Sequence, residues 1–140
     1  MTKIDFFSNA PNRLEYVTRL LKKVLAAQQK AVVFAPANTL SQLSDALWQL
    51  DGFCAHDVIT PNAAEPLVAP IILTSTAPAN LPHYEVLINL SDELPSFFAA
   101  FLRLIEVVPA QDEPKQKARE RWAHYKSRGY PLTHFDIAKK

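Results

Sequence analysis

A group of cationic and aromatic residues near the end of the chain has the types and spacing best suited to binding chemistry. Within "KQKARERWAHYKSRGYP" (115–131), four residues share one narrow face of a helix at about 100° per residue: Lys115, Arg119, Trp122 and Lys126. Cations fixed on a helix can form charge-assisted hydrogen bonds with carboxylates, and the indole beside them offers an apolar slot. The pattern predicts a site for an acidic peptide with a hydrophobic residue, or for a terminal carboxylate.

Two other interpretations of this segment stay open on the sequence alone. Trp122 can be a core residue whose neighbouring cations only keep the helix soluble, or it can stack on bases of single-stranded nucleic acid. Ala118 and Tyr125 continue from Trp122 as an apolar side that faces the domain body, which places the indole between core and cations. The remaining cations fall on the opposite side and predict a solvated face: Lys117, Arg121 and Arg128.

The charge of the chain is unevenly distributed along its length. From Lys115 onward, eight Lys and Arg oppose Glu120 and Asp136, a net +6, while the whole chain carries only +1. The residues before Lys115 therefore carry −5 and would repel a polyanion that extends beyond the basic segment. We expect direct nucleic-acid binding to be weak or absent.

The sequence lacks the motifs of common enzyme and cofactor sites. Its two glycines, Gly52 and Gly129, cannot form a dinucleotide-binding glycine loop or a phosphate-binding loop. The histidines are too scattered to predict a metal site, and the lone Cys54 is interpreted as an interior or interface residue. A site built from dispersed residues such as His56, Asp57 and Glu85 has little in its favour. We expect no cofactor, no metal and no catalysis.

The first half of the chain alternates predicted strands and helices. A strand is expected in "KIDFFS" (3–8), followed by a helix from about Leu14 to Leu25 with apolar residues at helical spacing. The wholly apolar "AVVFA" (31–35) is typical of a strand covered on both faces in a parallel sheet. A second helix opens with Thr39 and Gln42 in capping-box register and stops at residues 51–52.

The second half continues the alternation. Strands are expected within 67–75, where Pro70 implies an edge position or a late start, and within 84–90. An aromatic stripe predicts a helix over 95–108, and a last helix runs from about Asp112 to Gly129. Together these elements predict one α/β domain over residues 1–140: a Rossmann-like layered fold with a mostly parallel sheet flanked by helices and no nucleotide-binding glycine loop.

No part of the sequence directs the chain to a membrane. No apolar run approaches the roughly 20 residues that cross a bilayer, and the start "MTKIDFFSNA" lacks the zones of a signal peptide. We expect a cytoplasmic protein.

The tail "VVPAQDEPKQKARERWAHYKSRGY" (107–130) resembles the C-terminal signature of the chi subunit of bacterial DNA polymerase III holoenzyme. The order of "AVVFA", "DALWQL" and "FCAH" is similar to chi segments more weakly. The resemblance implies a noncatalytic adaptor that couples the clamp-loader complex to single-stranded-DNA-binding protein.

The resemblance also implies two binding surfaces. One receives the acidic, phenylalanine-ended C-terminal peptide of single-stranded-DNA-binding protein; the residues that match its motif are Val108, Lys115, Arg119, Trp122 and Lys126. The other binds the psi subunit, and Trp48 and Phe53 match its aromatic positions. Trp48 lies off the leucine stripe of its predicted helix, in agreement with a surface role, whereas Phe53 could equally pack under the sheet.

Overall fold

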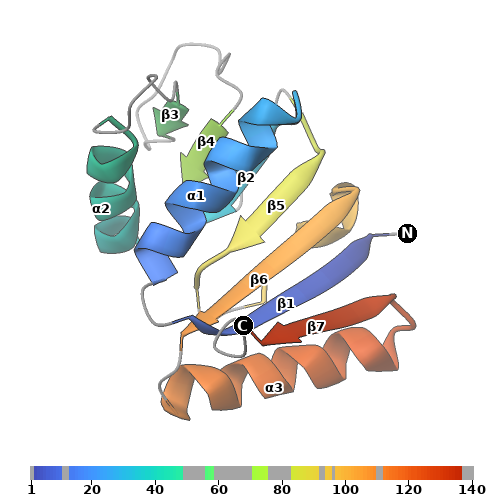
Figure 1. Cartoon of the computed structure of the whole chain (residues 1–140). Coiled ribbons are helices and arrows are strands. Elements are labelled where there is room, and N and C mark those ends of the chain that lie inside the picture. The colour runs from blue at the N-terminus through green and yellow to red at the C-terminus, as the bar shows by residue number, and fades with distance from the viewer. Residues whose placement is uncertain are drawn as a thin grey trace.

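Seven strands form one sheet in the order β3-β4-β2-β5-β6-β1-β7 (Figure 1). The structure is a computed structural model that describes residues 2–10, 13–48, 56–58, 71–75, 83–91, 94–95, 97–109 and 112–136. Every pairing between neighbouring strands is parallel. The strands are β1 Lys3–Ala10, β2 Ala31–Phe34, β3 His56–Val58, β4 Ile71–Thr74, β5 Val86–Asn89, β6 Arg103–Pro109 and β7 Leu132–Asp136.

Helices cover both faces of the sheet. Helices α1 (Arg13–Ala26) and α2 (Ala37–Trp48) pack on one face, and α3 (Asp112–Ser127) packs with the short 3-10 helix η1 (Phe98–Ala100) on the other (Figure 1). Each face has its own hydrophobic core. This arrangement confirms the predicted α/β layered fold. Within the described residues, no helix is both long enough and apolar enough to span a bilayer.

The central strands are apolar on both sides because both sides are covered. All residues of β2, β4 and β5 are buried. In β2, Val33 points to the α1 and α2 side, whereas Val32 and Phe34 point to the α3 side. A parallel sheet buried in this way needs continuous apolar runs instead of alternation, and this confirms the interpretation of "AVVFA".

The predicted helix over 95–108 is wrong. Only residues 98–100 form a 3-10 turn, and the chain then enters β6, which pairs with β5 and β1 inside the sheet. Ile105 and Val107 face the α1 side, while Leu104 and Val108 face the α3 side. A strand buried on both faces also supplies apolar residues at helical spacing, so periodicity alone could not separate the two structures.

Smaller differences concern where elements begin. Strand β4 starts at Ile71 and lies inside the sheet, so Pro70 marks a late start and not an edge. Helix α2 begins at Ala37, earlier than the predicted Thr39 cap, and the Asn38 side chain accepts a hydrogen bond from the Thr39 N–H. Strands β3 and β7 were not predicted.

Helix α3 ends as predicted at Gly129. This glycine has a φ of 81°, a left-handed conformation that glycine adopts without a steric penalty. Its N–H donates to the carbonyl of Lys126, and the N–H of Tyr130 donates to the carbonyl of Tyr125. This pair of bonds is a Schellman motif, which satisfies carbonyls that the helix end would leave free.

Replacing Gly129 by Ala is expected to lower the free energy of unfolding by about 1 kcal/mol. A Cβ at this position meets no atom within 4 Å, so the loss comes from the backbone conformation and not from a clash. Gln28 holds the matching left-handed position after α1, with a φ of 59°, and Gln28→Gly is the control that should not lower stability. Urea unfolding measures both variants, and equal stability of Gly129→Ala and wild type would contradict the assignment.

Candidate functional site

A cavity of about 350 Å³ opens between α3 and the ends of β1 and β6. Its size lies in the range of small-ligand and side-chain pockets. Strand residues and α3 residues both line it: Phe6, Ser8, Asn9, Val108, Lys115, Ala118, Arg119, Trp122 and His134.

The topology of the sheet explains why a cavity forms at this place. Strands β1 and β6 are neighbours, but β1 leads into α1 on one face and β6 leads into α3 on the other. Where the connections of adjacent parallel strands diverge in this way, their carboxyl ends leave a crevice. The register of β1 with β6 also shifts between Phe7 and Ala10, and Asn9 has a φ of 59°. Such a bulge redirects side chains at the rim.

The floor of the cavity is apolar. Phe6, Val108 and Ala118 belong to the core on the α3 side and are almost fully buried. Trp122 packs edge-on against Phe6, with ring centroids 5.1 Å apart at 73°. The indole is half-buried and still lines the cavity, so it sits between core and cations as the helical wheel predicts.

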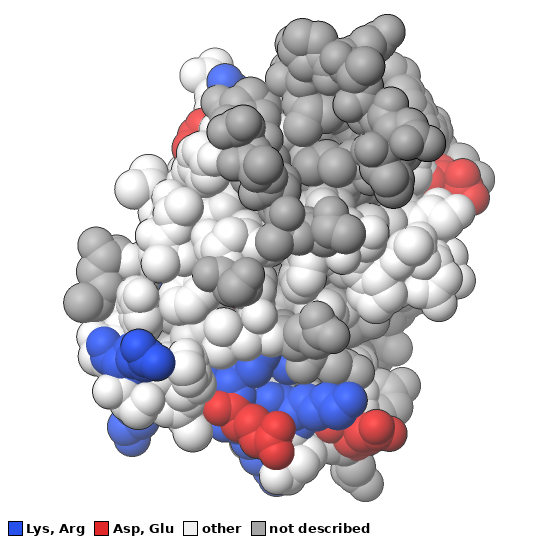
Figure 2. Space-filling model, turned by 180° about the vertical axis from the view of Figure 1, so that it is seen from behind, with Lys and Arg blue, Asp and Glu red and all other residues white. Residues whose placement is uncertain are grey.

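Two cations stand at the rim. Lys115 is half-buried and Arg119 is exposed, and both line the cavity from α3. Within the described part of the chain, neither is paired with a carboxylate. Figure 2 shows Lys and Arg gathered along the edge of the molecule where α3 runs, with Asp and Glu among them. The surface along α3 is therefore mixed in charge, and Lys115 and Arg119 are its cations at the cavity rim.

The structure brings together four of the five residues predicted for the peptide surface. Val108, Lys115, Arg119 and Trp122 line the one cavity, whereas Lys126 is exposed and does not line it. Lys126 lies one turn beyond Trp122 on the same side of α3, where the helix has already passed the cavity.

Apart from Val108, the sequence does not predict the strand residues of the cavity. Ser8 of β1 and His134 of β7 form a hydrogen bond of 2.6 Å between Oγ and Nε2, and the His134 ring lies 6.3 Å from that of Trp122. Because side chains alternate along a strand, "KIDFFS" predicts that Phe6 and Ser8 point to the same face of the sheet. Only the strand order shows that α3 covers this face and that β7 is the neighbouring strand.

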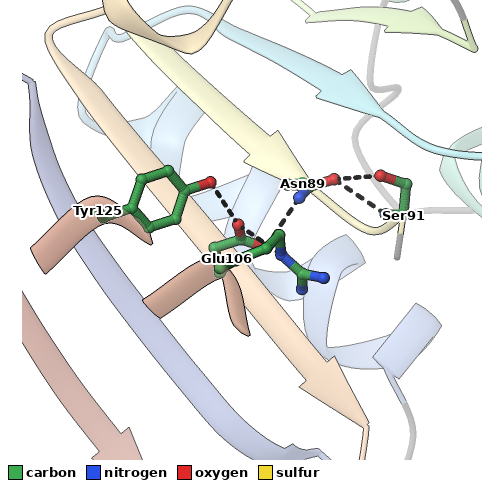
Figure 3. A network of polar contacts seen from close by, with 5 residues as sticks. Asn89, Ser91, Glu106 and Tyr125 are labelled. Carbon is green, nitrogen blue, oxygen red and sulfur yellow. Dashed lines mark hydrogen bonds and ion pairs between the residues drawn. The ribbon is translucent and has the colours of Figure 1, made fainter. Parts of the chain in front are cut away.

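A buried polar network lies under α3 (Figure 3). Glu106 of β6 is fully buried and accepts hydrogen bonds from Arg121 Nε at 3.0 Å, Tyr125 Oη at 2.8 Å and Asn89 Nδ2 at 2.9 Å. The side chain of Asn89 in turn accepts from the backbone and hydroxyl of Ser91. Figure 3 shows Tyr125 and Asn89 on opposite sides of Glu106.

The position of Arg121 corrects the prediction of a solvated face. Its side chain is only 7% exposed and forms an ion pair with Glu106. On the wheel, Arg121 lies next to Tyr125, at the margin of the face that meets the sheet. The sequence alone does not reveal this partner, because its pattern predicts a helix at Glu106 and no single segment gives the order of the strands.

Burial dominates the ionisation of this network. It raises the pKa of Glu106, and the positive charge of Arg121 and the hydrogen bonds from Arg121, Asn89 and Tyr125 oppose that rise. Burial and the nearby Glu106 also raise the pKa of Tyr125 far above its ordinary value. The phenol therefore keeps its proton in the folded protein.

The second predicted surface lies largely outside the described residues. Trp48 is the last residue of α2, and the structure describes its backbone only. Phe53 lies outside the described residues altogether. Their roles stay predictions.

Comparisons with known proteins agree in pointing to one family. Residues 1–133 match the family described as "DNA polymerase III chi subunit, HolC", a span that contains every cavity residue except His134. A Pseudomonas aeruginosa protein named "DNA polymerase III subunit chi" is 30% identical over 139 residues, covering 94% of each chain. A protein of the same name from Haemophilus influenzae is 32% identical over 94 residues, covering 66% of this chain and 64% of that protein.

The raised pKa of Tyr125 predicts a loss of stability at alkaline pH. Above about pH 10, the unfolded chain releases the phenolic proton while the folded chain retains it, so the free energy of unfolding falls as pH rises. Tyr125→Phe removes this term. Urea unfolding at pH 8, 10 and 11 should show the wild type losing about 1 kcal/mol more than the variant over the last step. Parallel losses in both proteins would show that Tyr125 ionises normally.

Proposed function

The chain belongs to the DNA polymerase III chi subunit family, and we propose that it is a noncatalytic adaptor that captures the acidic C-terminal peptide of single-stranded-DNA-binding protein. Family membership supports an accessory role in the replisome, in the cytoplasm. One observation carries the peptide site: four residues that match the family motif meet at a single cavity with an apolar floor and a cationic rim.

The apolar floor suits the terminal phenylalanine of such a peptide. The ring would lie against Trp122, with Phe6 and Val108 below it. Removing a phenylalanine side chain from water contributes about 1.5–3 kcal/mol. This term makes the peptide site selective for an apolar end residue.

The rim suits the negative charges of the peptide. The planar guanidinium of Arg119 can form two parallel hydrogen bonds with one carboxylate, whereas Lys115 acts as a point charge. Lys126, outside the cavity on the same side of α3, would meet an acidic residue further from the peptide end. Because the rim cations are solvent-accessible, the affinity should fall as salt rises.

The adaptor role also needs a second partner, for which we propose the psi subunit of the clamp-loader complex. The predicted contact residues are Trp48, at the end of α2, and Phe53. Helix α2 packs on the opposite face of the sheet from α3. The two partners would then bind different faces and need not compete.

Two substitutions on α3 test the peptide site. Arg119→Ala and Trp122→Ala should each cost about 1–3 kcal/mol in peptide binding, measured by fluorescence anisotropy with a labelled acidic peptide that ends in Phe. Arg128→Ala is the matched control, because Arg128 is an exposed cation in the turn directly after α3 and does not line the cavity. Wild-type affinity in both test variants would refute the site. Tight binding of a bare oligonucleotide, with no preference for the peptide, would favour the alternative function of single-stranded nucleic-acid binding.

Substitutions at the other surface test the psi contact. Trp48→Ala and Phe53→Ala should reduce co-purification with a psi subunit, because each truncates an aromatic anchor. Peptide affinity should stay within about twofold of the wild type, since additivity is expected for distant sites. Unchanged co-purification of both variants would place the psi contact elsewhere.

A further inference from the structure

One row of side chains crosses the sheet beneath α3. The strand registers align, from β7 to β2, His134, Phe6, Glu106, Asn89 and Phe34. Glu106 is the one carboxylate in this row and lies at its centre. The other side chains of the row are apolar or polar without a carboxylate, and the buried Glu106 needs hydrogen-bond donors.

Helix α3 contacts this row through three residues of two successive turns: Arg121, Trp122 and Tyr125. Trp122 packs on Phe6, while Arg121 and Tyr125 both donate to the same oxygen of Glu106, at 3.0 and 2.8 Å. Asn89 occupies the other oxygen. The Glu106 carboxylate thus accepts three hydrogen bonds from described residues, and two of the three donors belong to α3.

Among the described residues, a cavity lies on each flank of α3. On one side lies the cavity described above, lined by Lys115 and Arg119. Lys117 and Glu120, on the other side of the helix, line a second cavity of about 530 Å³ at the ends of β2, β4 and β5. The described contacts that hold the rotation of α3 therefore lie beneath the helix, in the core on this face of the sheet and at Glu106.

We infer that Glu106 is the positioning residue of the peptide cavity: through Arg121 and Tyr125 it fixes the rotation of α3. A turn of the helix by one residue, about 100°, would take Arg121 away from Glu106 and leave a buried carboxylate without its cation. Breaking a buried pair on one side is strongly unfavourable. Only one rotation satisfies the carboxylate, and that rotation turns the Lys115, Arg119 and Trp122 side toward the cavity.

The inference rests on the proposed function for its affinity readout, so the test adds a readout that does not need the peptide. Uniform ¹⁵N labelling gives an indole N–H signal for Trp122, assigned by its loss in Trp122→Phe. Glu106→Gln keeps the side-chain volume but turns one acceptor into a donor that faces other donors. We expect a displaced Trp122 signal and about tenfold weaker peptide binding, because the residues act in one network.

A control separates positioning from stability. Leu21→Ala removes a fully buried side chain from α1, on the opposite face of the sheet. It should lower the melting temperature but leave the Trp122 signal in place and the peptide affinity within about twofold of the wild type, since distant sites are nearly additive.

Two further variants decide the matter if Glu106→Gln does not fold. Tyr125→Phe removes one donor and should weaken peptide binding about threefold, with a smaller displacement of the Trp122 signal. The double variant Glu106→Leu and Arg121→Met removes both charges, which proteins often tolerate. It should fold without recovering wild-type affinity, because the hydrogen bonds to Glu106 that select one rotation of α3 are lost.

The outcomes distinguish this inference from the proposed function. If the wild type does not bind the peptide, the proposed function fails. The role of Glu106 is then tested only by whether the Trp122 indole signal moves in the Glu106 variants. If the wild type binds but the folded Glu106 variants show wild-type affinity and an unmoved Trp122 signal, Glu106 does not position α3. Equal losses in Leu21→Ala and the Glu106 variants would also overturn the inference.

Discussion

The burial of a carboxylate in the middle of the sheet is the constraint on which the cation-bearing side of this protein depends. Glu106 cannot be left among apolar side chains without donors, and Arg121 and Tyr125 supply them from α3. A buried ion pair adds little to stability compared with apolar packing, but it is directional. The same helix that satisfies Glu106 on its underside carries Lys115 and Arg119 at the cavity rim, where neither pairs with a carboxylate of the described residues. One set of contacts thus orients both the core side and the surface side of α3.

The sheet accounts for the remaining half of the site. A Rossmann-like sheet offers crevices where the connections of neighbouring strands diverge, and many proteins fill them with a glycine loop that cradles phosphate. This chain has only Gly52 and Gly129, too few glycines for that motif. Side chains line the crevice between β1 and β6, apolar at the floor and cationic at the rim.

Sequence reasoning succeeded where the information is local. Helix α3 has regular spacing, a proline near its start and a glycine after its end, so a wheel correctly placed Lys115, Arg119 and Trp122 on one side and Tyr125 on the buried side. It failed where partners are distant in the chain. Strand β6 resembled an aromatic helix because burial on both faces hides the period of two.

The strand-side residues of the cavity depend on the order of strands, which no single segment encodes. Phe6 and His134 become neighbours only because β7 pairs with β1 after α3 has crossed the sheet. For the same reason, Arg121 could not be separated from the solvated cations: its partner Glu106 comes from a strand that had been misassigned. Local pattern therefore predicts the α3 wall of the cavity, the family resemblance adds Val108, and only the tertiary structure shows the contributions of β1 and β7.

The most direct measurement compares two acidic peptides that differ only in their last residue, Phe or Ala, by titration into the ¹⁵N-labelled protein. If the cavity holds the terminal ring, the Phe peptide shifts the indole signal of Trp122 saturably, and the Ala peptide binds at least about tenfold more weakly. If both peptides bind equally, or if the Trp122 signal does not move, charge alone attracts the peptide and the cavity is not its docking site.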